Sequence, residues 1–194
     1  IIHGDSRKEI CNIHKGIDLV ITSPPYLNSR DYTDIYRLEM WMLGYVSTFD
    51  GERVFRKNAL TSHVQIQLPK VDYPNVEELK VAINYLESDK AELWNLNIPN
   101  MIRGYFNDMH ELLFDLKPKL NPNAKLYINV SNSSYSNHII EVDVIIAKVA
   151  ELIGYKCEEI RVARPIKTSC QQASNIKLNK MRESIIVLQN IVGI

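Results

Sequence analysis

The sequence predicts an α/β fold in which a mostly parallel sheet ends in an antiparallel hairpin. Short apolar runs typical of buried strands alternate with stretches whose apolar residues recur every three or four positions, as in helices. The last two apolar runs, 156–163 and 183–190, have no helical pattern between them, which predicts the hairpin. With 194 residues, 45% of them apolar, the chain is long enough for one domain, 1–194, with a sizeable core.

The N-terminal elements are predicted from short local signals. Residues 1–2 are two isoleucines that suit the end of a buried strand, and a Gly-Asp turn follows them. Residues 7–16 suit a short helix that stops at Gly16. The continuous run 17–21, "IDLVI", predicts a strand buried on both faces. An amphipathic helix is predicted over 33–45 from an apolar stripe made of Ile35, Leu38, Met42 and Tyr45.

The second half of the chain carries stronger patterns. Residues 46–98 are predicted to leave the core as an inserted excursion, with a helix near 76–93. Pro99 then opens a long helix whose buried stripe is Ile102, Phe106, Met109, Leu113 and Leu116. The run 125–132, "KLYINVSN", predicts a buried strand, and a helix over 141–153 is predicted to end at Gly154.

Composition excludes several classes of protein. No run approaches the ~18 apolar residues of a membrane span, and no signal peptide opens the chain. The three cysteines, Cys11, Cys157 and Cys170, are far apart and form no CxxC, so neither a disulfide framework nor a metal site is predicted. We therefore expect a cytoplasmic protein.

Net charge is formally zero, but the basic residues are unevenly placed. The segment 161–182 carries six basic residues and no acidic one, and its loop is longer than a hairpin requires. A solvated basic loop would show the same composition. The alternative is a DNA-binding surface, in which basic side chains contact phosphates and two glutamines read base edges. Those residues are Arg164, Lys167, Lys177, Lys180 and Arg182, with Gln171 and Gln172.

The segment "TSPPY", Thr22 to Tyr26, follows the strand 17–21 directly. Sites in α/β sheets lie at the carboxyl ends of strands, and the Gly-Asp turn at 4–5 falls at such an end too. Pro24 and Pro25 have no N–H, so neighbouring carbonyls stay free to accept hydrogen bonds. The Ser23 hydroxyl is a second acceptor, and Tyr26 adds a flat ring. The simpler interpretation is a strand ended by prolines, with a tyrosine that only packs.

Two acceptors beside an aromatic ring suit an amino group carried by a planar base. Acceptors that hold both amine hydrogens favour a pyramidal nitrogen whose lone pair points outward. Fixed positioning against an electrophile can remove roughly 7–11 kcal/mol from a barrier. A base in a duplex would have to be flipped out to reach such a site, and stacking on Tyr26 would hold it.

The segment resembles motif IV of the amino-methyltransferases that modify DNA, (Asp/Asn/Ser)-Pro-Pro-(Tyr/Phe). The serine form is closer to the cytosine-N4 branch than to the adenine-N6 branch, where aspartate is usual. The similarity to site-specific bacterial and archaeal enzymes extends over "GDS", "IDLVITSPPYLNSRDYTDIYRLEMWMLG", "FNDMHELLFDLKPKLNPNAKLYINVSNSSY" and "RESIIVLQN". It implies a Rossmann-like, S-adenosylmethionine-dependent sheet that acts on DNA in a restriction–modification system.

Carried over residue by residue, the resemblance implies a role for each part of the motif. Ser23, the Pro24 carbonyl, Pro25 and Tyr26 would form the catalytic grip on the base. Asp5 and Ser6 would approach the adenine of S-adenosylmethionine, and Thr22 would lie near its methionine end. The residues that continue the motif would line the pocket for the base, although Asp31 suits a helix cap equally well; they are Asn28, Arg30, Asp31 and Tyr32.

The glycines depart from the family pattern. These enzymes bind the cofactor on an FxGxG loop, whereas no two of the seven glycines in this chain form GxG. We therefore expect the chain to hold only the catalytic half, with the cofactor loop on a preceding segment or a second subunit. One alternative is a split or degenerate half that only binds DNA or a partner. An enzyme acting on RNA, or on a protein glutamine, is another, although the glutamine enzymes typically have asparagine in place of Ser23.

Overall fold

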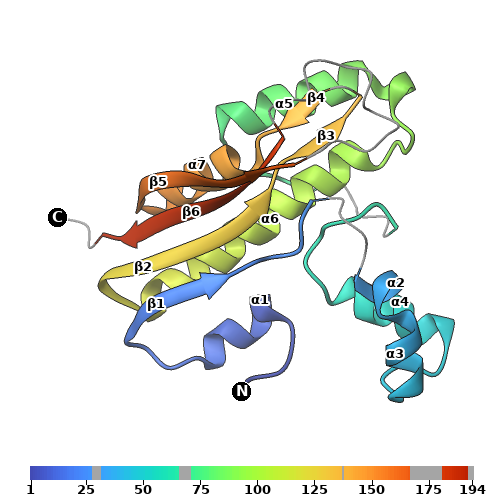
Figure 1. Ribbon diagram of the computed structural model, residues 1–194, viewed down its shortest axis with the longest axis horizontal. Coiled ribbons are helices and arrows are strands. Elements are labelled where there is room, and N and C mark those ends of the chain that lie inside the picture. The colour runs from blue at the N-terminus through green and yellow to red at the C-terminus, as the bar shows by residue number, and fades with distance from the viewer. Residues whose placement is uncertain (28–31, 66–70, 137, 167–180, 192–194) are drawn as a thin grey trace.

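The computed structural model describes residues 1–27, 32–65, 71–136, 138–166 and 181–191. A four-stranded sheet carries helices on one face, and three short helices form a lobe beside it (Figure 1). Two 3₁₀ segments, η2 (Lys90–Glu92) and η3 (Lys117–Lys119), lie in the connections between larger elements.

The sheet has the spatial order β1-β2-β6-β5. Its strands are β1 (Ile17–Thr22), β2 (Leu120–Ser131), β5 (Tyr155–Pro165) and β6 (Arg182–Asn190). β1 and β2 are parallel, and β6 is antiparallel to both of its neighbours, so β1, β2 and β5 share one direction and only β6 opposes them. The predicted α/β fold with a C-terminal antiparallel hairpin is confirmed. A second, two-stranded sheet pairs β3 (Ser133–Tyr135) with β4 (His138–Ile140).

The core lies between the sheet and three helices, α5 (Glu77–Ser88), α6 (Ile98–Leu116) and α7 (Val142–Ile153). Figure 1 shows α6 and α7 on the same face of the sheet. The predicted stripe of α6 is buried, with Ile102, Phe106, Met109 and Leu113 no more than 1% exposed. Each such side chain contributes about 1.5–3 kcal/mol by leaving water, so this stripe is a main source of stability.

Gly154 ends α7 in the left-handed region, at φ 89°, as its position in the sequence predicts. A Cβ there would have space, since its nearest neighbour would be the Lys117 Nζ at 3.5 Å. We therefore expect Gly154→Ala to lower the free energy of unfolding by about 1–2 kcal/mol through backbone strain alone. Gly51→Ala, within helix α4, is the control and should raise it by up to about 1 kcal/mol. Urea unfolding measures both changes, and equal effects would contradict the strain.

The excursion predicted over 46–98 consists of two unlike parts. Its helix α4 (Phe49–Lys57) forms the lobe together with α2 (Tyr32–Ile35) and α3 (Arg37–Met42), which precede the excursion in the sequence, while α5 belongs to the core. The single helix predicted over 33–45 is wrong, because the chain breaks at Tyr36 between α2 and α3. Its apolar stripe is exposed rather than buried, with Leu38 69% and Met42 78% exposed.

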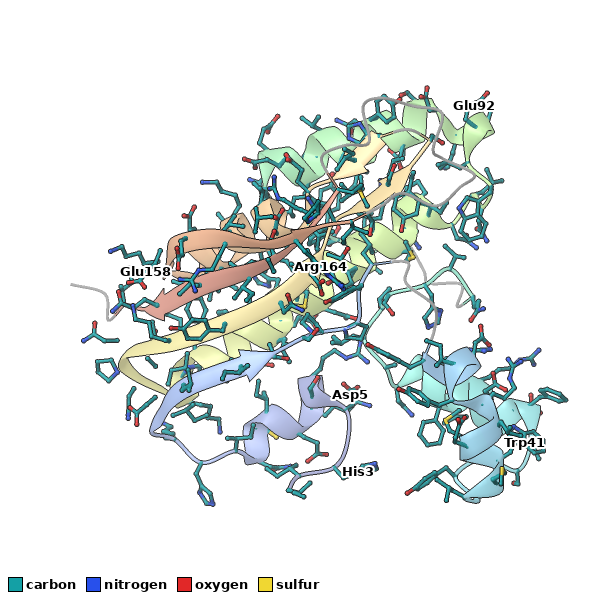
Figure 2. All side chains as sticks on the ribbon, in the orientation of Figure 1. His3, Asp5, Trp41, Glu92, Glu158 and Arg164 are labelled. Carbon is teal, nitrogen blue, oxygen red and sulfur yellow. The ribbon has the colours of Figure 1, made fainter. Side chains whose placement is uncertain are left out.

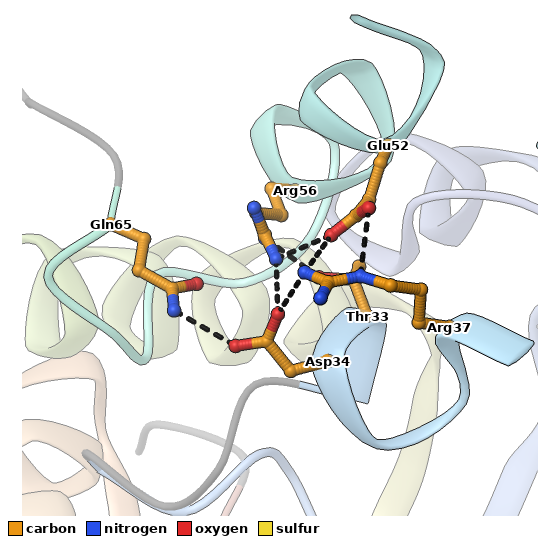
Figure 3. Close-up of polar contacts among 6 residues, drawn as sticks. All are labelled: Thr33, Asp34, Arg37, Glu52, Arg56 and Gln65. Atoms are coloured by element: carbon orange, nitrogen blue, oxygen red, sulfur yellow. Dashed lines mark hydrogen bonds and ion pairs between the residues drawn. The ribbon is translucent and has the colours of Figure 1, made fainter. Parts of the chain in front are cut away.

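A network of polar side chains, rather than the apolar stripe, joins the helices of this lobe (Figure 3). The Glu52 side chain is 2% exposed and lies between two guanidinium groups. Arg37 donates to it through Nη2 at 2.8 Å and Nε at 3.1 Å, and the Arg56 Nη2 donates at 2.5 Å. Asp34 also accepts hydrogen bonds from both arginines. Ion pairs made by two arginines thus hold these helices together. The spacing of apolar residues over 33–45 had predicted a buried apolar stripe in this role.

The N-terminal predictions need correction. Ile1 and Ile2 form no strand and are exposed, and the helix predicted over 7–16 is a short α1 (Ser6–Glu9) followed by the 3₁₀ helix η1 (Ile10–Asn12). β1 is not buried on both faces, since Leu19 is 53% and Ile21 75% exposed. Among the described strands β1 pairs only with β2, so one edge and one face of it are uncovered.

Candidate functional site

The segment that follows β1 lies where three strands present their ends. The carboxyl ends of the parallel strands β1 and β2 meet the amino end of β6, because β6 runs the opposite way. Ser23 is exposed, Pro24 is buried, and Pro25 and Tyr26 are half-buried. The motif therefore combines an accessible hydroxyl with a partly covered ring at one edge of the sheet.

The Tyr26 hydroxyl is held by residues from two other strands. It donates a hydrogen bond to the Glu183 Oε1 of β6. The Asn129 Nδ2 of β2 donates to the Tyr26 hydroxyl at 2.7 Å and to the Glu183 Oε1 at 3.1 Å. Burial and the bond to Glu183 raise the pKa of Tyr26, so it stays a neutral phenol at physiological pH.

Glu183 is the charged centre of this group. Its side chain is 12% exposed, and its second oxygen accepts a hydrogen bond from the Arg164 Nε at 2.5 Å. Hydrogen bonds from Tyr26, Arg164 and Asn129 lower the pKa of the Glu183 carboxyl, which is therefore ionised. We call Tyr26, Asn129, Glu183 and Arg164 the tyrosine clamp.

The backbone of the motif is fixed on both sides. Thr22 pairs with Ile128 in the ladder between β1 and β2. On the other side Leu27 is 2% exposed, and its carbonyl accepts a hydrogen bond from the Ser133 Oγ at 2.5 Å. Among the described residues, no backbone N–H donates to the Pro24 carbonyl. The prolines thus sit in a rigid segment whose Pro24 carbonyl is left as an acceptor.

Asp5, expected near a cofactor, is engaged by Arg7. Its side chain is 7% exposed and caps α1 by accepting from the Arg7 N–H at 3.1 Å. The Arg7 guanidinium donates to both Asp5 oxygens and to Asp108, which also accepts from the Thr61 N–H. Burial opposes ionisation of Asp5, but the bonds from Arg7 outweigh it and lower the pKa of Asp5. In Figure 2 Asp5 lies by α1, away from Arg164.

Ser6 and Thr22, the other residues expected near S-adenosylmethionine, belong to two different elements. Ser6 is the first residue of the four-residue helix α1, and half-buried Thr22 ends β1 beside the motif. A dinucleotide or nucleoside cofactor is usually approached closely by a glycine-rich backbone, and no GxG occurs in the sequence. Cofactor roles for Asp5, Ser6 and Thr22 stay predictions.

Most of the predicted DNA-binding residues lie outside the described residues. These are Asn28, Arg30, Lys167, Gln171, Gln172, Lys177 and Lys180, together with Asp31 of the predicted base pocket. Arg164 is described, and its side chain is 72% exposed although it contacts Glu183. Arg182 is less available, because its Nε donates to the Asp143 Oδ2 at 2.7 Å and its Nη2 to the Asp143 Oδ1 at 3.2 Å. Tyr32 is exposed and stacks on Tyr36.

Sequence reasoning missed Asn129 and Glu183. Both are polar residues inside or beside the apolar runs 125–132 and 183–190, which by themselves predict only strands. The signal available was their position. Each falls at the edge of the sheet where "TSPPY" ends β1, and a polar side chain in a strand close to a site edge is a candidate for that site.

Other kinds of site find no support in the described part of the chain. It contains no group of three His, Cys, Asp or Glu side chains that could hold a metal ion. None of the helices that it describes combines the length and apolar character needed to cross a bilayer.

Comparison with known proteins relates this chain to methyltransferases. No protein-family model matches it. It is 31% identical over 185 residues to the type II methyltransferase M.AvaI of Nostoc sp., and 30% identical over 191 residues to the type II methyltransferase M.BsoBI of Geobacillus stearothermophilus. Both matches cover 88% of this chain, but they cover only 37% of M.AvaI and 38% of M.BsoBI.

Among solved structures, the chain resembles TTHA0409 of Thermus thermophilus, a candidate DNA modification methylase complexed with S-adenosyl-L-methionine. The TM-score is 0.49 with 13% identity, over 98% of this chain and 55% of the other. The two type II methyltransferases are more similar to this chain in sequence, at 31% and 30% identity. Over most of its length, therefore, this chain is similar to somewhat more than a third of a type II methyltransferase.

Proposed function

We propose that this chain is the base-binding, catalytic part of an S-adenosylmethionine-dependent DNA amino-methyltransferase. The observation that carries the proposal is the pairing of an exposed Ser23 with a Tyr26 ring fixed by the tyrosine clamp, at the carboxyl end of β1. Similarity to type II methyltransferases supports it independently. Metal-assisted chemistry is not needed for this reaction, because the nucleophile is an amine that only has to be held and aimed.

The chain's own residues would act on the acceptor base. The Tyr26 ring would stack on a base that has been flipped out of the duplex. The Ser23 oxygen and the Pro24 carbonyl would accept the two amine hydrogens and turn the nitrogen lone pair away from the ring. S-adenosylmethionine would supply an electrophilic methyl group. No ionised base is required first, because the nitrogen becomes acidic only after it has been alkylated.

The donor would be held largely by another segment, of the same polypeptide or of a second subunit. One edge of β1 pairs with no strand that the structure describes, and this supports the proposal. Leu19 and Ile21 support it too, because they are 53% and 75% exposed on one face of that strand. A strand added there would continue the sheet and cover both side chains. It would also place a cofactor loop beside Thr22.

Basic residues near the hairpin would bind the DNA backbone. The proposed phosphate ligands are Arg164, Lys167, Lys177 and Lys180, with Gln171 and Gln172 reading base edges and Asn28 and Arg30 lining the base pocket. The Arg164 side chain supports this placement, because it is 72% exposed although it pairs with Glu183 in the tyrosine clamp. Binding of this kind weakens steeply as salt is added.

We propose cytosine N4 as the target because Ser23 occupies the first position of the motif. Adenine N6 is the alternative base. A half that binds DNA or a partner without methylating anything is the alternative function, and the absence of a GxG sequence favours that candidate.

Product analysis tests the proposal. The full-length protein is incubated with duplex DNA and S-adenosylmethionine labelled in the methyl group, and the digested nucleosides are separated and weighed by mass spectrometry. We expect labelled N4-methylcytosine. Labelled N6-methyladenine would overturn the choice of base and keep the enzyme class. DNA binding without any labelled nucleoside would overturn the catalytic proposal in favour of the binding half.

A further inference from the structure

We propose that Glu183 is a positioning residue that joins two DNA contacts, holding the Tyr26 ring for the flipped base and the Arg164 guanidinium for a backbone phosphate near that base. This inference rests on the proposed function, because it concerns how the same site takes its DNA. It goes further by assigning a task to a residue outside the motif and by making the base contact and the phosphate contact depend on each other.

The two oxygens of the Glu183 carboxylate have different partners. Oε1 accepts from the Tyr26 hydroxyl and from the Asn129 Nδ2 at 3.1 Å, whereas Oε2 accepts from the Arg164 Nε at 2.5 Å. The Glu183 side chain is only 12% exposed, so water competes little for either oxygen. Because an ionised carboxylate accepts on both oxygens at once, the ring and the guanidinium are held simultaneously.

The register of β5 against β6 aims Arg164 at this carboxylate. Val162 pairs with Ser184 and Arg164 pairs with Glu183, so β5 has one residue more than β6 over this step, Ala163. An extra residue of this kind, as in a β-bulge, changes the direction of the side chains that follow it. Without it Ala163 would lie opposite Glu183, and Arg164 would point to the other face of the sheet, because side chains alternate along a strand.

Arg164 can bind Glu183 and a phosphate together. A guanidinium carries five N–H donors, of which the Nε–H is used by Glu183. Among the described residues Nη1 and Nη2 of Arg164 have no partner, and the side chain is 72% exposed. Two N–H groups of a guanidinium match the oxygens of a phosphate. The carboxylate therefore fixes one edge of the guanidinium and leaves the other donors for the DNA backbone.

Both contacts lie at one edge of the sheet. Tyr26 follows β1 and Arg164 lies next to the last residue of β5, and these two strands run in the same direction. Asn129 of β2 and Glu183 of β6 lie between them in the order β1-β2-β6-β5. Figure 2 shows Arg164 at the sheet. The spacing between ring and guanidinium is thus set by paired strands, which suits a positioning role.

Glu183→Gln is the informative substitution because it keeps the shape of the side chain and removes its charge. We expect kcat for DNA methylation to fall about 10- to 100-fold, the range for a lost hydrogen bond to a charged group. The KM for DNA should rise by less than about threefold, because the substitution removes no cation and only the alignment of the bound base is lost. An unchanged kcat would overturn the proposal.

The matched control is Glu158→Gln, the same change in another ion pair of the sheet. Glu158 pairs with Lys125, and Figure 2 shows it far from Arg164 along β5. Its kcat should equal that of the wild type. An equal loss of kcat in both variants would show that any ion pair of the sheet supports activity, and it would overturn a special role for Glu183.

Two double-mutant cycles separate the joint role from general support of the fold. Glu183→Gln is combined with Tyr26→Phe in the first cycle and with Arg164→Ala in the second. In each, the loss of kcat/KM in the double variant should be at least about threefold smaller than the product of the single losses, because the group that Glu183 holds is already gone. A general loss of fold would lower each rate by an independent factor. Coupling in only one cycle, or in neither, would overturn the proposal.

A measurement without methyl transfer keeps this inference distinct from the proposed function. NMR follows the ¹³Cζ resonance of Tyr26 and the ¹⁵Nε resonance of Arg164, which are identified by their loss in Tyr26→Phe and Arg164→Lys. In the absence of DNA, Glu183→Gln should shift both resonances and Glu158→Gln neither. A shift of only one would overturn the joint role. A wild type that transfers no methyl group, with both resonances shifted by Glu183→Gln, would overturn only the proposed function.

Discussion

Replacing Tyr26 by alanine is expected to slow methyl transfer by the full-length protein at least 100-fold. Stacking of a base on an aromatic ring contributes about 1–3 kcal/mol, and alanine removes that platform. Alanine also leaves Asn129 and Glu183 without the hydroxyl that joins them. Without the ring the base is also less precisely positioned, which lowers the rate further. Displacement of a reacting group by about 1 Å can cost roughly 100-fold in rate. Steady-state methylation of a cognate duplex measures the change.

Two other tyrosine variants give this result its meaning. Tyr26→Phe retains the ring and should lose less activity than the alanine variant. Tyr45→Ala removes a tyrosine that is 65% exposed on the lobe and should leave the rate unchanged. If Tyr26→Ala kept a rate near that of the wild type, the base would not stack there, and the interpretation of "TSPPY" as a grip on the base would be wrong.

The fold was predictable where burial and periodicity agree. The stripe from Ile102 to Leu113 and the Gly154 terminator follow from helix geometry alone, and both are found in the structure. The run 17–21 predicted a strand correctly, but burial on both faces depends on a neighbour that no pattern within the run can reveal. Among the described residues, that neighbour is missing from one side of β1.

The lobe was mispredicted for a different reason. Apolar spacing over 33–45 indicated a buried stripe, but α2 and α3 are tied to α4 by ion pairs around Glu52. Residues 33–37 and 52–56 meet only in the folded chain, and charge pairing of this kind leaves no periodic trace. Periodicity could therefore identify an amphipathic pattern there without identifying what it packs against.

The candidate site was predictable in its local part only. "TSPPY" is a contiguous segment, and its chemistry can be inferred from residue types. Asn129 and Glu183 reach Tyr26 across more than a hundred residues, through the order of strands in the sheet. Placing them would have required the register between β2 and β6, in which Ser131 faces Glu183. Sequence periodicity does not give that register.

Replacing Arg182 by alanine is expected to lower the free energy of unfolding by about 3–5 kcal/mol, the cost of removing one partner of a buried ion pair. The Asp143 side chain that it contacts is fully buried, at 0% exposed. That carboxylate also accepts from the Val144 N–H at 2.9 Å in the first turn of α7, but Arg182 supplies its compensating charge. Urea unfolding at neutral pH measures the loss.

The same variant decides between two roles for a basic residue. Arg161→Ala is the control, because Arg161 is 63% exposed and pairs with Glu159 on the surface of β5, where such a pair contributes at most about 1 kcal/mol. If Arg182 were chiefly a phosphate ligand, its removal would spare stability and reduce the salt dependence of DNA binding by about one unit of slope. A large loss of stability with an unchanged slope would instead assign Arg182 to the junction of β6 and α7. In that case Arg182 and Glu183, adjacent in sequence, anchor opposite faces of one strand, and only Glu183 belongs to the site.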